Sequence, residues 1–596
     1  MKYTFKYTKV LGLAVAATLA FGACSDDWDE HYNVKPLENN GGSLWEAIAS
    51  DEDLSNFAMV LDSCEFDNNL RSSQVFTVFA PTNNGFTVEE AEAWIQKYKE
   101  DKKHGVKDDE NRTLKEFIKN HITLYSQSVS TVTNDTLEML NGKRIPLTSE
   151  EFGEHAFVSK NNRCTNGVLF KMDGQAAFFH NIFELLATDK DLDSVKRFLY
   201  SYNKYRFFPE MSVEGGIENG QTWYLDSVEV LQNDLFSRTN VVANDRSYQN
   251  VPWGKINDED SIYCMVVPTN SEWERLVAEY EPYFNYPDNV EKRDSLIYTN
   301  ARLAILEGSV FSQSNNARWN GDSVISTNAI PYLSRQYAYG SSDANYYIYH
   351  NPMQEGGVFY GAQEFDCSNG KLFKSNKWNI DKTQTFCQTI LVEAEQHMKS
   401  YDKVMAMVPT QTYYNTEYPL YEQISNHSAL YLVQKTSEAT PYVEIELPNV
   451  LAGMGYDIQL VLLPPVYYEN DTTYWRMEGV NDTVPLPNVV SVFLSYPYQD
   501  GTMNNKNADD ETNILDLGDL WEKDEFFYTE KPGEIDTITV AENFKFPTCA
   551  AGLGANAKVS MKIRNDYMSF TDEGFASKHL LIDCVILKPH VEAEEE

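Results

Sequence analysis

VFTVFAPTNNGF, residues Val75 to Phe86, joins a run of β-branched and aromatic residues to a polar turn that begins at Pro81. This pattern predicts a buried strand that leads into a helix. The same pattern returns as IYCMVVPTNSEW, residues Ile262 to Trp273. Two copies of so specific a joint indicate an internal repeat, and the repeat sets the expected domain organisation.

The chain is long and strongly acidic. Its 596 residues correspond to roughly three or four domains of ordinary size. Aromatic residues make up 13% of the chain, which is typical of ordered, strand-rich protein rather than of disorder. A net charge of -40 repels phosphate backbones and anionic lipid headgroups. We therefore expect neither nucleic-acid binding nor electrostatic attachment to a membrane.

The first 23 residues predict export. A basic start precedes an apolar run, residues 10–20, that is too short to span a bilayer, as in a signal peptide. The run ends in Phe-Gly-Ala-Cys24, which resembles a bacterial lipobox with Cys24 as the lipidated residue. The alternative is an ordinary cleavage site beside an incidental cysteine. Residues 24–42 then form an acidic tether whose first residues, SDDWDE, resemble the signal that sends Bacteroidota lipoproteins to the outer face of the outer membrane. A tether that is merely solvated is the alternative.

Seven further cysteines are scattered along the chain without the spacing of a zinc site or of a disulfide framework. Their odd number argues against complete pairing. Cys64 and Cys584 lie within apolar patterns, so we expect both to be buried fillers rather than ligands or nucleophiles. The sequence predicts no metal site and no cofactor.

Residues 43–180 are expected to form one domain of mixed helix and strand. Ser43 and Glu46, and again Thr87 and Glu90, have the spacing of a capping box, which marks a helix start. Thr82 and the amides after it are expected to satisfy backbone groups at the start of the next helix. An Asn141-Gly142 turn then separates two short strands.

TVFAPTNNGF, residues 77–86, and NGVLFKMDG, residues 166–174, together resemble the two sequence boxes of the fasciclin (FAS1) domain. The resemblance spans about residues 43–186 and implies a function in adhesion or protein contact. Two positions depart from the family pattern. Gly85 stands where the family usually has Ala, and Asn120-His121 stands where some members have a Tyr-His pair implicated in integrin contact. We do not extend integrin recognition to this chain, and we expect His121 to be structural.

A second copy of this module is predicted from residue 181. Residues 181–199 align without a gap on residues 43–61, at an offset of 138 residues. The offset grows to 187 residues at Pro268 and to 203 residues at Asn369, because the second copy has absorbed insertions.

Two insertions distinguish the second copy, which we predict to span residues 181–396. Residues 201–260 are expected to form extra strands or a hairpin. Residues 318–361 are dense in Tyr and Asn, and exposed tyrosines beside amides would suit a sugar or peptide ligand. Ordinary strand packing by Tyr is the alternative, and the sequence favours it. The candidate binding residues are Tyr337, Tyr339, Tyr346, Tyr347 and Tyr349.

Residues 397–596 are expected to form an all-β domain. Strands separated by loops rich in Pro, Asn and Asp predict a β-sandwich of jelly-roll type. The expected strands are 429–433, 442–447, 456–463, 489–494, 538–540, 559–564 and 580–587. Asp509, Asp510 and Glu511 could help to hold calcium, but a solvated acidic loop is the favoured interpretation. The fold class is thus α+β, with two fasciclin-like domains followed by a C-terminal β-sandwich.

The sequence carries no Gly-rich phosphate loop, no HExxH and no GxSxG. We therefore expect a protein that is not an enzyme. The alternative is a surface glycan hydrolase, because glycosidase carboxylates have no obligatory local spacing.

Asp followed by Ser or Thr, and then by an aliphatic residue or Thr, recurs along the chain. The pattern resembles the O-glycosylation site of exported Bacteroidota proteins, although such pairs are also common at turns and strand starts. The candidate acceptors are Thr136, Ser194, Ser227, Ser261, Ser295, Ser323, Thr472, Thr483 and Thr537.

Together these features predict a lipoprotein that is anchored in the outer membrane, faces the cell exterior and acts in adhesion or ligand binding. A sharper hypothesis makes it an accessory of a SusC/SusD-type nutrient importer. Its partners would then be a TonB-dependent transporter and a SusD-like lipoprotein, and its ligand a glycan or a peptide.

Overall fold

The computed structural model divides the chain into two compact units, residues 1–180 and residues 181–596. Each unit is described by itself. The structure describes residues 42–130, 134–208, 213–218, 221–226, 229–236, 254–312, 321–327, 346–404, 406–408, 410–412, 420–435, 441–468, 475–477, 479–480, 484–504, 527–552, 558–566 and 576–590.

Two helices of the first unit, α3 and α6, begin at the caps that the sequence predicts. The Glu46 amide donates to Ser43 Oγ at 3.3 Å and the Ser43 amide donates to Glu46 Oε2 at 2.8 Å, which completes a capping box. Thr87 and Glu90 form a second box. The helical segments are α3 (Leu44–Ala49), η2 (Glu52–Leu54), α4 (Ser55–Ser63), α5 (Asp67–Arg71), α6 (Val88–Lys103), the π-helix η3 (Thr113–Ile118) and η4 (Lys119–His121).

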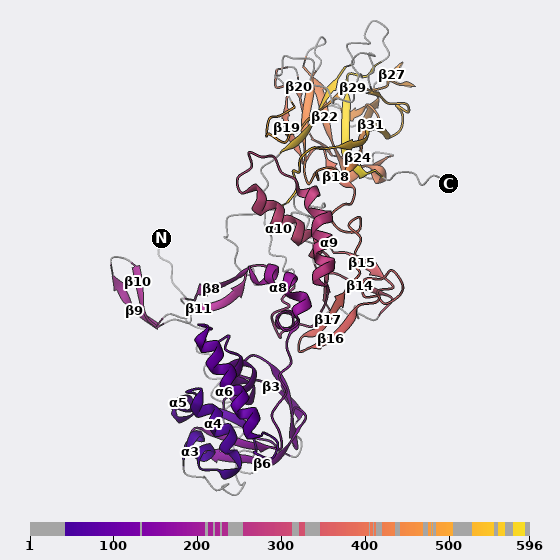
Figure 1. Cartoon of the computed structure of the whole chain (residues 1–596). Helices are drawn as coiled ribbons and strands as arrows, with labels where there is room; N and C mark the ends of the chain where they lie inside the picture. Colours follow the sequence, from indigo (N-terminus) through magenta and orange to yellow (C-terminus); the bar gives the residue numbers. More distant parts are fainter. Residues whose placement is uncertain are drawn as a thin grey trace, which may run out of the picture. The chain divides into compact units, whose positions relative to one another are not determined.

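One seven-stranded sheet, in the order β2-β1-β7-β6-β5-β4-β3, forms the other half of the first unit (Figure 1). Its strands are β1 (Phe76–Pro81), β2 (Ile122–Leu124), β3 (Asn134–Glu138), β4 (Arg144–Thr148), β5 (Glu151–Phe152), β6 (His155–Cys164) and β7 (Gly167–Met172). β1 runs parallel to β7 with Phe76 opposite Gly167, whereas the other neighbouring pairs are antiparallel.

β1 is buried on both faces. Val78 belongs to a hydrophobic cluster formed with the helices. Phe79 points into a second cluster, where its ring stacks on Phe152 at 3.9 Å and on Phe170 at 5.0 Å between centroids. The continuous apolar run of this strand follows from its position between two cores.

The second unit starts with the same succession of elements. They are α7 (Ile182–Leu185), η5 (Lys190–Leu192), α8 (Asp193–Tyr200), β12 (Tyr263–Pro268), α9 (Asn270–Tyr280), η7 (Glu281–Phe284), α10 (Arg293–Leu306), β13 (Val310–Ser312), β16 (Gln363–Cys367) and β17 (Gly370–Ser375). The strands form a sheet in the order β13-β12-β17-β16. β12 runs parallel to β17 with Tyr263 opposite Gly370, which is the register of β1 and β7.

Both insertions contain antiparallel strand pairs. In the first, β9 (Val213–Glu218) pairs with β10 (Gln221–Asp226), and β8 (Asn203–Phe207) pairs with β11 (Glu229–Asn233). The predicted extra strands are therefore confirmed. In the second, β14 (Ser323–Ile325) pairs with β15 (Ile348–His350).

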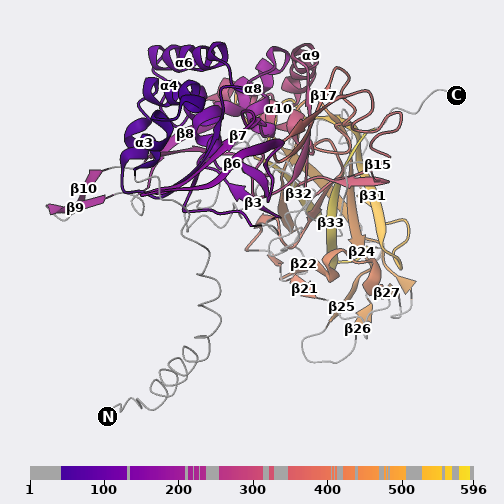
Figure 2. The same ribbon diagram turned by 90° about the horizontal axis from the view of Figure 1, so that it is seen from below.

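Two antiparallel sheets make up the C-terminal part of the second unit, and all seven predicted strands are found there. The larger sheet contains β18 (Ile390–Glu393), β20 (Ala406–Met407), β21 (Thr410–Thr412), β22 (Ser428–Gln434), β24 (Gly455–Leu463), β31 (Asp536–Lys545) and β33 (Leu580–Pro589). The smaller has the order β19-β23-β32-β29-β30, with β19 (Met398–Tyr401), β23 (Tyr442–Leu447), β32 (Val559–Asn565), β29 (Val489–Ser495) and β30 (Phe527–Tyr528). β22, β24 and β33 lie side by side (Figure 2). Two short strand pairs complete this part: β25 (Val466–Tyr468) pairs with β26 (Trp475–Met477), and β27 (Gly479–Val480) pairs with β28 (Val484–Pro485). It also contains the 3-10 helical turns η8 (Tyr421–Gln423) and η9 (Ser425–His427).

The C-terminal sheets begin earlier than residue 397, where the sequence placed their start. β18 already pairs with β33, with Ile390 opposite Leu587. One hydrophobic cluster also extends from Ile182 to Leu587. The buried Tyr286 hydroxyl donates to the Ala551 carbonyl at 2.7 Å. The second unit is therefore one body with a continuous core, because the end of its first part packs into the C-terminal sheets.

Candidate binding surfaces

Asn166 holds three separate segments of the first unit together. Its Oδ1 accepts the Leu44 amide at 2.8 Å, and its Nδ2 donates to the carbonyls of Leu70 and Ser72, each at 2.8 Å. The side chain is buried at 6% exposure, so these partners replace the water that it has lost. The Asn-Gly-Val turn at residues 166–168, which opens the second fasciclin-like sequence box, therefore has a structural role.

The second unit repeats these contacts residue for residue. Asn369 Oδ1 accepts the Ile182 amide at 2.9 Å, and Asn369 Nδ2 donates to the carbonyls of Ile256 at 2.8 Å and Asp258 at 2.9 Å. The offsets of 138 residues at Leu44 and Ile182, and of 203 residues at the two asparagines, are those of the sequence alignment.

The asparagine after each strand-turn joint is also repeated. Asn83 Oδ1 accepts the Asn56 amide at 3.1 Å, and its Nδ2 donates to the Glu52 carbonyl at 2.8 Å. Asn270 Oδ1 accepts the Ser194 amide at 2.9 Å, and its Nδ2 donates to the Lys190 carbonyl at 2.9 Å.

Thr82 does not satisfy a helix start, contrary to the prediction. Its Oγ1 donates to the Met172 carbonyl at 3.0 Å. Thr82 directly follows β1, so the nearest acceptor lies at the end of the parallel strand β7, and the helix cap comes five residues later at Thr87.

The two departures from the family pattern have clear structural settings. A Cβ at Gly85 would lie 1.6 Å from the Asp173 carbonyl oxygen, so this backbone accepts only glycine there. His121 is fully buried, and its Nδ1 contacts the Phe117 carbonyl at 2.8 Å while its Nε2 accepts the Ala176 amide at 2.9 Å. Burial lowers the pKa of His121 to about 4. The expected structural role of His121 is confirmed by these contacts.

An open acidic recess of about 500 Å³ lies at the first helices of the first unit. Glu46, Asp51 and Glu52 line it together with Gly42, Ala47 and Ser50. Asp51 is already paired with Lys171 on β7. The recess can attract cations, but its lining is mainly polar, whereas small-molecule sites are usually lined mainly by apolar groups.

The candidate tyrosines separate into two groups. Tyr346 is exposed at 54%, whereas Tyr349 is buried at 3% and its hydroxyl has no hydrogen-bond partner. The Tyr347 hydroxyl donates to the buried carboxylate of Glu307. Tyr337 and Tyr339 lie outside the described residues. Of the three candidate tyrosines that the structure describes, Tyr346 is thus the one that a ligand could reach readily.

Tyr346 belongs to the outer face of the β14–β15 pair. Ile325 lies opposite Ile348 across the two strands, and both are exposed, at 38% and 48%. Val324 and Tyr349, on the other face, are buried. This alternation leaves an apolar surface of Ile325, Tyr346 and Ile348, hereafter the β14–β15 surface, on the solvent side.

The candidate glycosylation acceptors differ in exposure. Thr136, Ser295 and Thr537 are exposed, and Ser194, Ser261 and Ser323 are half-buried. Outside the described residues lie Ser227, Thr472, Thr483, the signal peptide, Cys24 and the acidic residues Asp509, Asp510 and Glu511.

Three acidic side chains that sequence reasoning missed meet in the larger C-terminal sheet. They are Glu393, Glu395 and Asp583, and Oε2 of each glutamate is buried without a hydrogen-bond partner. The Ser425 amide donates to Asp583 at 3.1 Å, and the Ser425 hydroxyl donates to Glu393 at 2.5 Å. The signal was Asp583 itself, the one acidic residue within the largely apolar run LLIDCVILKP.

A register shift explains how Asp583 enters this acidic trio. Val461 pairs with Cys584 and Leu462 with Ile582, so Asp583 is an extra residue in the ladder between β24 and β33. Burial, followed by the charges of Glu393 and Glu395, raises the pKa of Asp583 to about 7. Burial likewise raises the pKa of Glu393. Asp583 is 2% exposed, so it is not placed to touch a substrate.

Within the described parts of the chain, no group of three or more His, Cys, Asp or Glu side chains is arranged to hold a metal ion. Over the same residues, no helix is long and apolar enough to cross a membrane.

Residues 52–174 match the family model of the fasciclin domain, so the first unit contains a fasciclin domain. No curated protein matches the chain. Similar solved structures include a FAS1 domain pair from the insect cell adhesion molecule Fasciclin I, which is 10% identical over 57% of this chain and 97% of that one, with a TM-score of 0.16.

Two glycoside hydrolases are also among the similar structures. The catalytic domain of a GH87 α-1,3-glucanase in complex with nigerose is 14% identical over 35% of this chain and 30% of its own, with a TM-score of 0.17. The CBM22-1–GH10 modules of Clostridium thermocellum xylanase 10B are 11% identical over 34% and 28%, with a TM-score of 0.16. Such scores carry no argument about fold or activity.

Proposed function

We propose that this chain is a non-enzymatic adhesion or ligand-binding lipoprotein with two fasciclin-like domains and a C-terminal β-sandwich of jelly-roll type. The fasciclin domain at residues 52–174 carries this proposal, since it suggests a role in adhesion or binding. The contacts of Asn166 that recur at Asn369 support a second fasciclin-like domain from residue 181.

The β14–β15 surface is the proposed contact site for a protein partner. Ile325, Tyr346 and Ile348 expose apolar area on a regular two-stranded pair, and an exposed aromatic residue beside aliphatic ones suits a protein contact. The surface lies in an insertion of the second copy, and inserted segments on a repeated scaffold are where binding specificity varies most readily.

The chain is further proposed to be anchored through a lipid on Cys24 at the exterior of the outer membrane. In this setting it would be an accessory of a SusC/SusD-type importer, contact a TonB-dependent transporter and a SusD-like lipoprotein, and help to capture a glycan or a peptide. The short apolar run before Cys24 and the acidic residues after it support this location.

A native pull-down from outer membranes tests the partner. The bait is the full chain, compared with a double variant Tyr346→Ser, Ile348→Ser and with a matched control Val404→Ser, Met407→Ser, whose exposed apolar side chains lie elsewhere in the second unit. We expect the wild type and the control to recover a transporter, and the double variant to lose it. Recovery of no transporter would contradict the accessory role, and undiminished recovery by the double variant would contradict the β14–β15 surface.

The anchor has a separate test. Cys24→Ser should move the chain from the membrane fraction to the soluble fraction and remove the mass of the lipid. Continued membrane retention without lipid would show that anchoring does not depend on Cys24.

A glycan hydrolase is the second candidate function, and the half-buried carboxyls of Glu393 and Glu395 are the observation that favours it, with the buried Asp583 acting on them and not on a substrate. The two glutamates and Asp583 differ in environment, as a general acid and its partner carboxylate do. The test is to measure hydrolysis of a panel of glycans. If the wild type hydrolyses one of them and the Glu395→Gln variant does not, the hydrolase proposal replaces the binding proposal. If the wild type hydrolyses none of them, the three carboxyl groups have a structural role only.

A further inference from the structure

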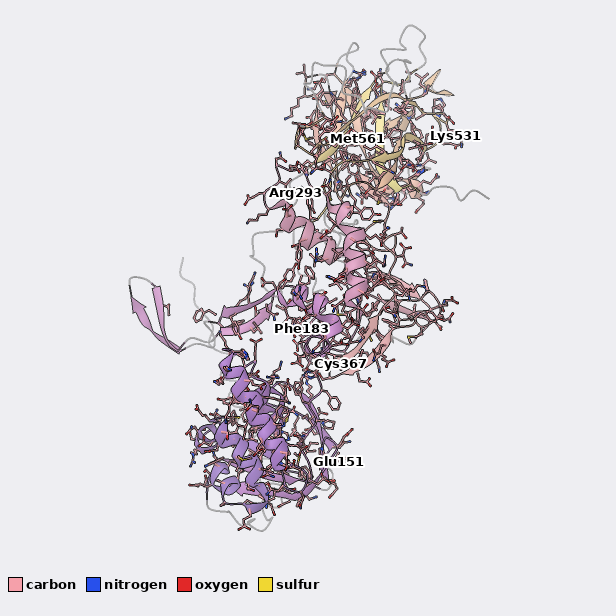
Figure 3. All side chains as sticks on the ribbon, viewed as in Figure 1. Glu151, Phe183, Arg293, Cys367, Lys531 and Met561 are labelled. Carbon is pink, nitrogen blue, oxygen red and sulfur yellow. The ribbon has the colours of Figure 1, made fainter. Side chains whose placement is uncertain are left out.

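The smaller C-terminal sheet has one apolar face and one polar face. Met561 and Ile563 of its central strand β32 are fully buried among the sheets, and Met561 is marked in Figure 3. Lys562 and Arg564, which alternate with them, point to the other face. Lys562 lies in register between Glu444 on β23 and Phe493 on β29.

Lys562 is flanked by two aromatic rings. Its Nζ lies 4.1 Å from the ring centroid of Tyr442 and 5.5 Å from that of Phe493. Both rings and the lysine are half-buried. Burial, and then the neighbouring Arg564, lower the pKa of Lys562, while the charges of Glu444 and Asp402 act in the opposite direction without reversing the shift. Cation–π contacts with the rings offset part of the water that the ammonium has lost, but they supply no hydrogen-bond acceptor.

The other cations of this face have carboxylate partners. Lys399 Nζ lies 2.8 Å from Glu444, and Arg564 Nε lies 2.8 Å from the buried Asp566. Glu444 also accepts the hydroxyls of Ser400 at 2.7 Å and Ser560 at 2.6 Å. Among the described residues Lys562 forms no hydrogen bond and no ion pair, since the nearby carboxylates are already engaged. A half-buried ammonium without an acceptor has a strong tendency to bind an anion.

The charge of the whole chain narrows the class of that anion. At a net charge of -40 the protein repels dense polyanions such as nucleic acids at long range. A ligand with a single carboxylate on an otherwise neutral, hydroxyl-rich frame experiences little of this repulsion. A sugar acid has this chemistry, and its C–H surface can pack against the edges of Tyr442 and Phe493.

We propose that the outer face of the smaller sheet, centred on Lys562 between Tyr442 and Phe493, is a binding site for otherwise neutral oligosaccharides that carry a single uronate residue. The uronate carboxylate accepts from Lys562 Nζ, and the two rings fix the sugar beside it. This site is separate from the fasciclin domain and from the β14–β15 surface, and it rests on the proposed function in that it gives the proposed glycan capture a site and a ligand class.

Isothermal titration of the full chain with a neutral oligosaccharide that ends in a single galacturonate residue tests the site. The matched ligand is the methyl ester of the same oligosaccharide, which keeps the sugar frame and removes the charge. We expect the acid to bind about ten- to hundredfold more tightly than the ester, as for a charge-assisted hydrogen bond. Equal affinity for acid and ester, or no binding of the acid, would overturn the proposal.

Variants then assign the binding to Lys562. Lys562→Met keeps the apolar stem and should lose the preference for the acid, Lys562→Arg should retain it, and Lys545→Met, a control at an exposed lysine of the other sheet, should behave as wild type. Circular dichroism checks that each variant is folded. Undiminished acid preference in Lys562→Met would overturn the site, and equally tight binding of polyglutamate would overturn the saccharide class. The membrane pull-down is read separately, so failure of either proposal is distinguishable from failure of the other.

Discussion

Asn166 in the first unit and Asn369 in the second hold equivalent backbone groups, but the sheets around them are completed differently. In the first unit, β6 continues into β5, β4 and β3, and a core around Phe79 and Phe152 lies against them. In the second, β16 ends a four-stranded sheet, and the core continues into the C-terminal sheets. The same joint therefore supports a self-contained domain in one place and one half of a larger body in the other.

This difference has a consequence for cooperativity. A unit with its own core can unfold by itself, whereas two parts that share one core lose their stability together. We expect two unfolding transitions, one for residues 43–180 and one for the whole second unit, and the following predictions test this division from the largest expected effect to the smallest.

Glycine-to-alanine changes at the two joints should have the largest effect. A Cβ at Gly167 would lie 1.9 Å from the Phe76 carbonyl oxygen, and a Cβ at Gly370 would lie 1.8 Å from that of Tyr263. Gly167→Ala should destabilise the first unit by about 5 kcal/mol and leave the second transition in place. Gly370→Ala should remove the transition of the second unit, including the C-terminal sheets. Urea unfolding followed by limited proteolysis measures both.

The division would be wrong if Gly370→Ala left the C-terminal sheets protected from protease. Gly105→Ala offers a control for the substitution itself, because a Cβ there meets nothing within 4 Å. Its positive φ of 74° makes some local strain the expected cost.

Asp583→Asn should change how the second unit responds to pH. The pKa of Asp583 is raised from 3.8 to about 7, so the native state binds more protons than the unfolded state between these values. Its contribution to stability is therefore present at low pH and is lost as pH rises through 7. The introduced amide would mimic the protonated carboxyl, and the variant should gain about 3 kcal/mol over wild type between pH 4 and pH 8, at about 1.4 kcal/mol per pKa unit less some relaxation.

Unfolding in urea at several pH values measures this gain. Because the core is continuous, the gain should appear in the whole second unit and not in the first. Glu542→Gln, at an exposed position of β31, is the control. A difference between Asp583→Asn and wild type that does not vary with pH would contradict the prediction.

Replacing Asn166 or Asn369 by alanine should lower the free energy of unfolding by less than the two glycine substitutions do. Each substitution removes three hydrogen bonds and leaves buried backbone groups without partners, which corresponds to about 2–3 kcal/mol. Asn166→Ala should lower only the first transition and Asn369→Ala only the second. Unequal costs, read from the urea midpoints, would show that the two joints are equivalent in geometry but not in energy.

Substitution of the lysine that occurs at equivalent positions in both units should have the smallest effect on stability. Lys171 pairs with Asp51 in the first unit, and Lys374 pairs with Asp189 at 2.7 Å in the second. Lys374→Met should cost about 0.5–1 kcal/mol at neutral pH, since the pair is partly exposed. The hydrogen bond from Lys374 lowers the pKa of Asp189, so this stabilisation is present at neutral pH and lost as pH falls through the acid range. A loss that persists at pH 2 would assign the effect to packing instead.

Much of this architecture could be predicted because its signals are local. The capping boxes at Ser43 and Thr87, the strand at residues 76–81 and the strands of the C-terminal third follow from residue spacing and from β-branched and aromatic composition. The mixed helix and strand content that an α+β class implies is confirmed, and so is the presence of a fasciclin domain.

The candidate binding residues could be predicted from the sequence only in part. Tyr346 and Tyr349 have the same side chain and almost the same sequence context, but one is exposed and the other is buried. Strand alternation shows that they face opposite ways, but not which face meets the core. The meeting of Glu393 with Asp583 depends on a register shift between β24 and β33, which has no local pattern.

The sequence by itself therefore determined the strand, the turn, the asparagine and the helix that follow one another in both units, because each depends on neighbours a few residues away. The capping box at Thr87 has no counterpart in the second unit, where the Thr269 side chain makes no capping hydrogen bond to the helix start. Only the tertiary structure decided that the second copy shares its core with the C-terminal sheets, that Asp583 is buried beside two glutamates, and that Lys562 lies between two rings without a counter-ion among the described residues. Burial and charge pairing depend on which distant segments come together, so they are set by packing rather than by local spacing.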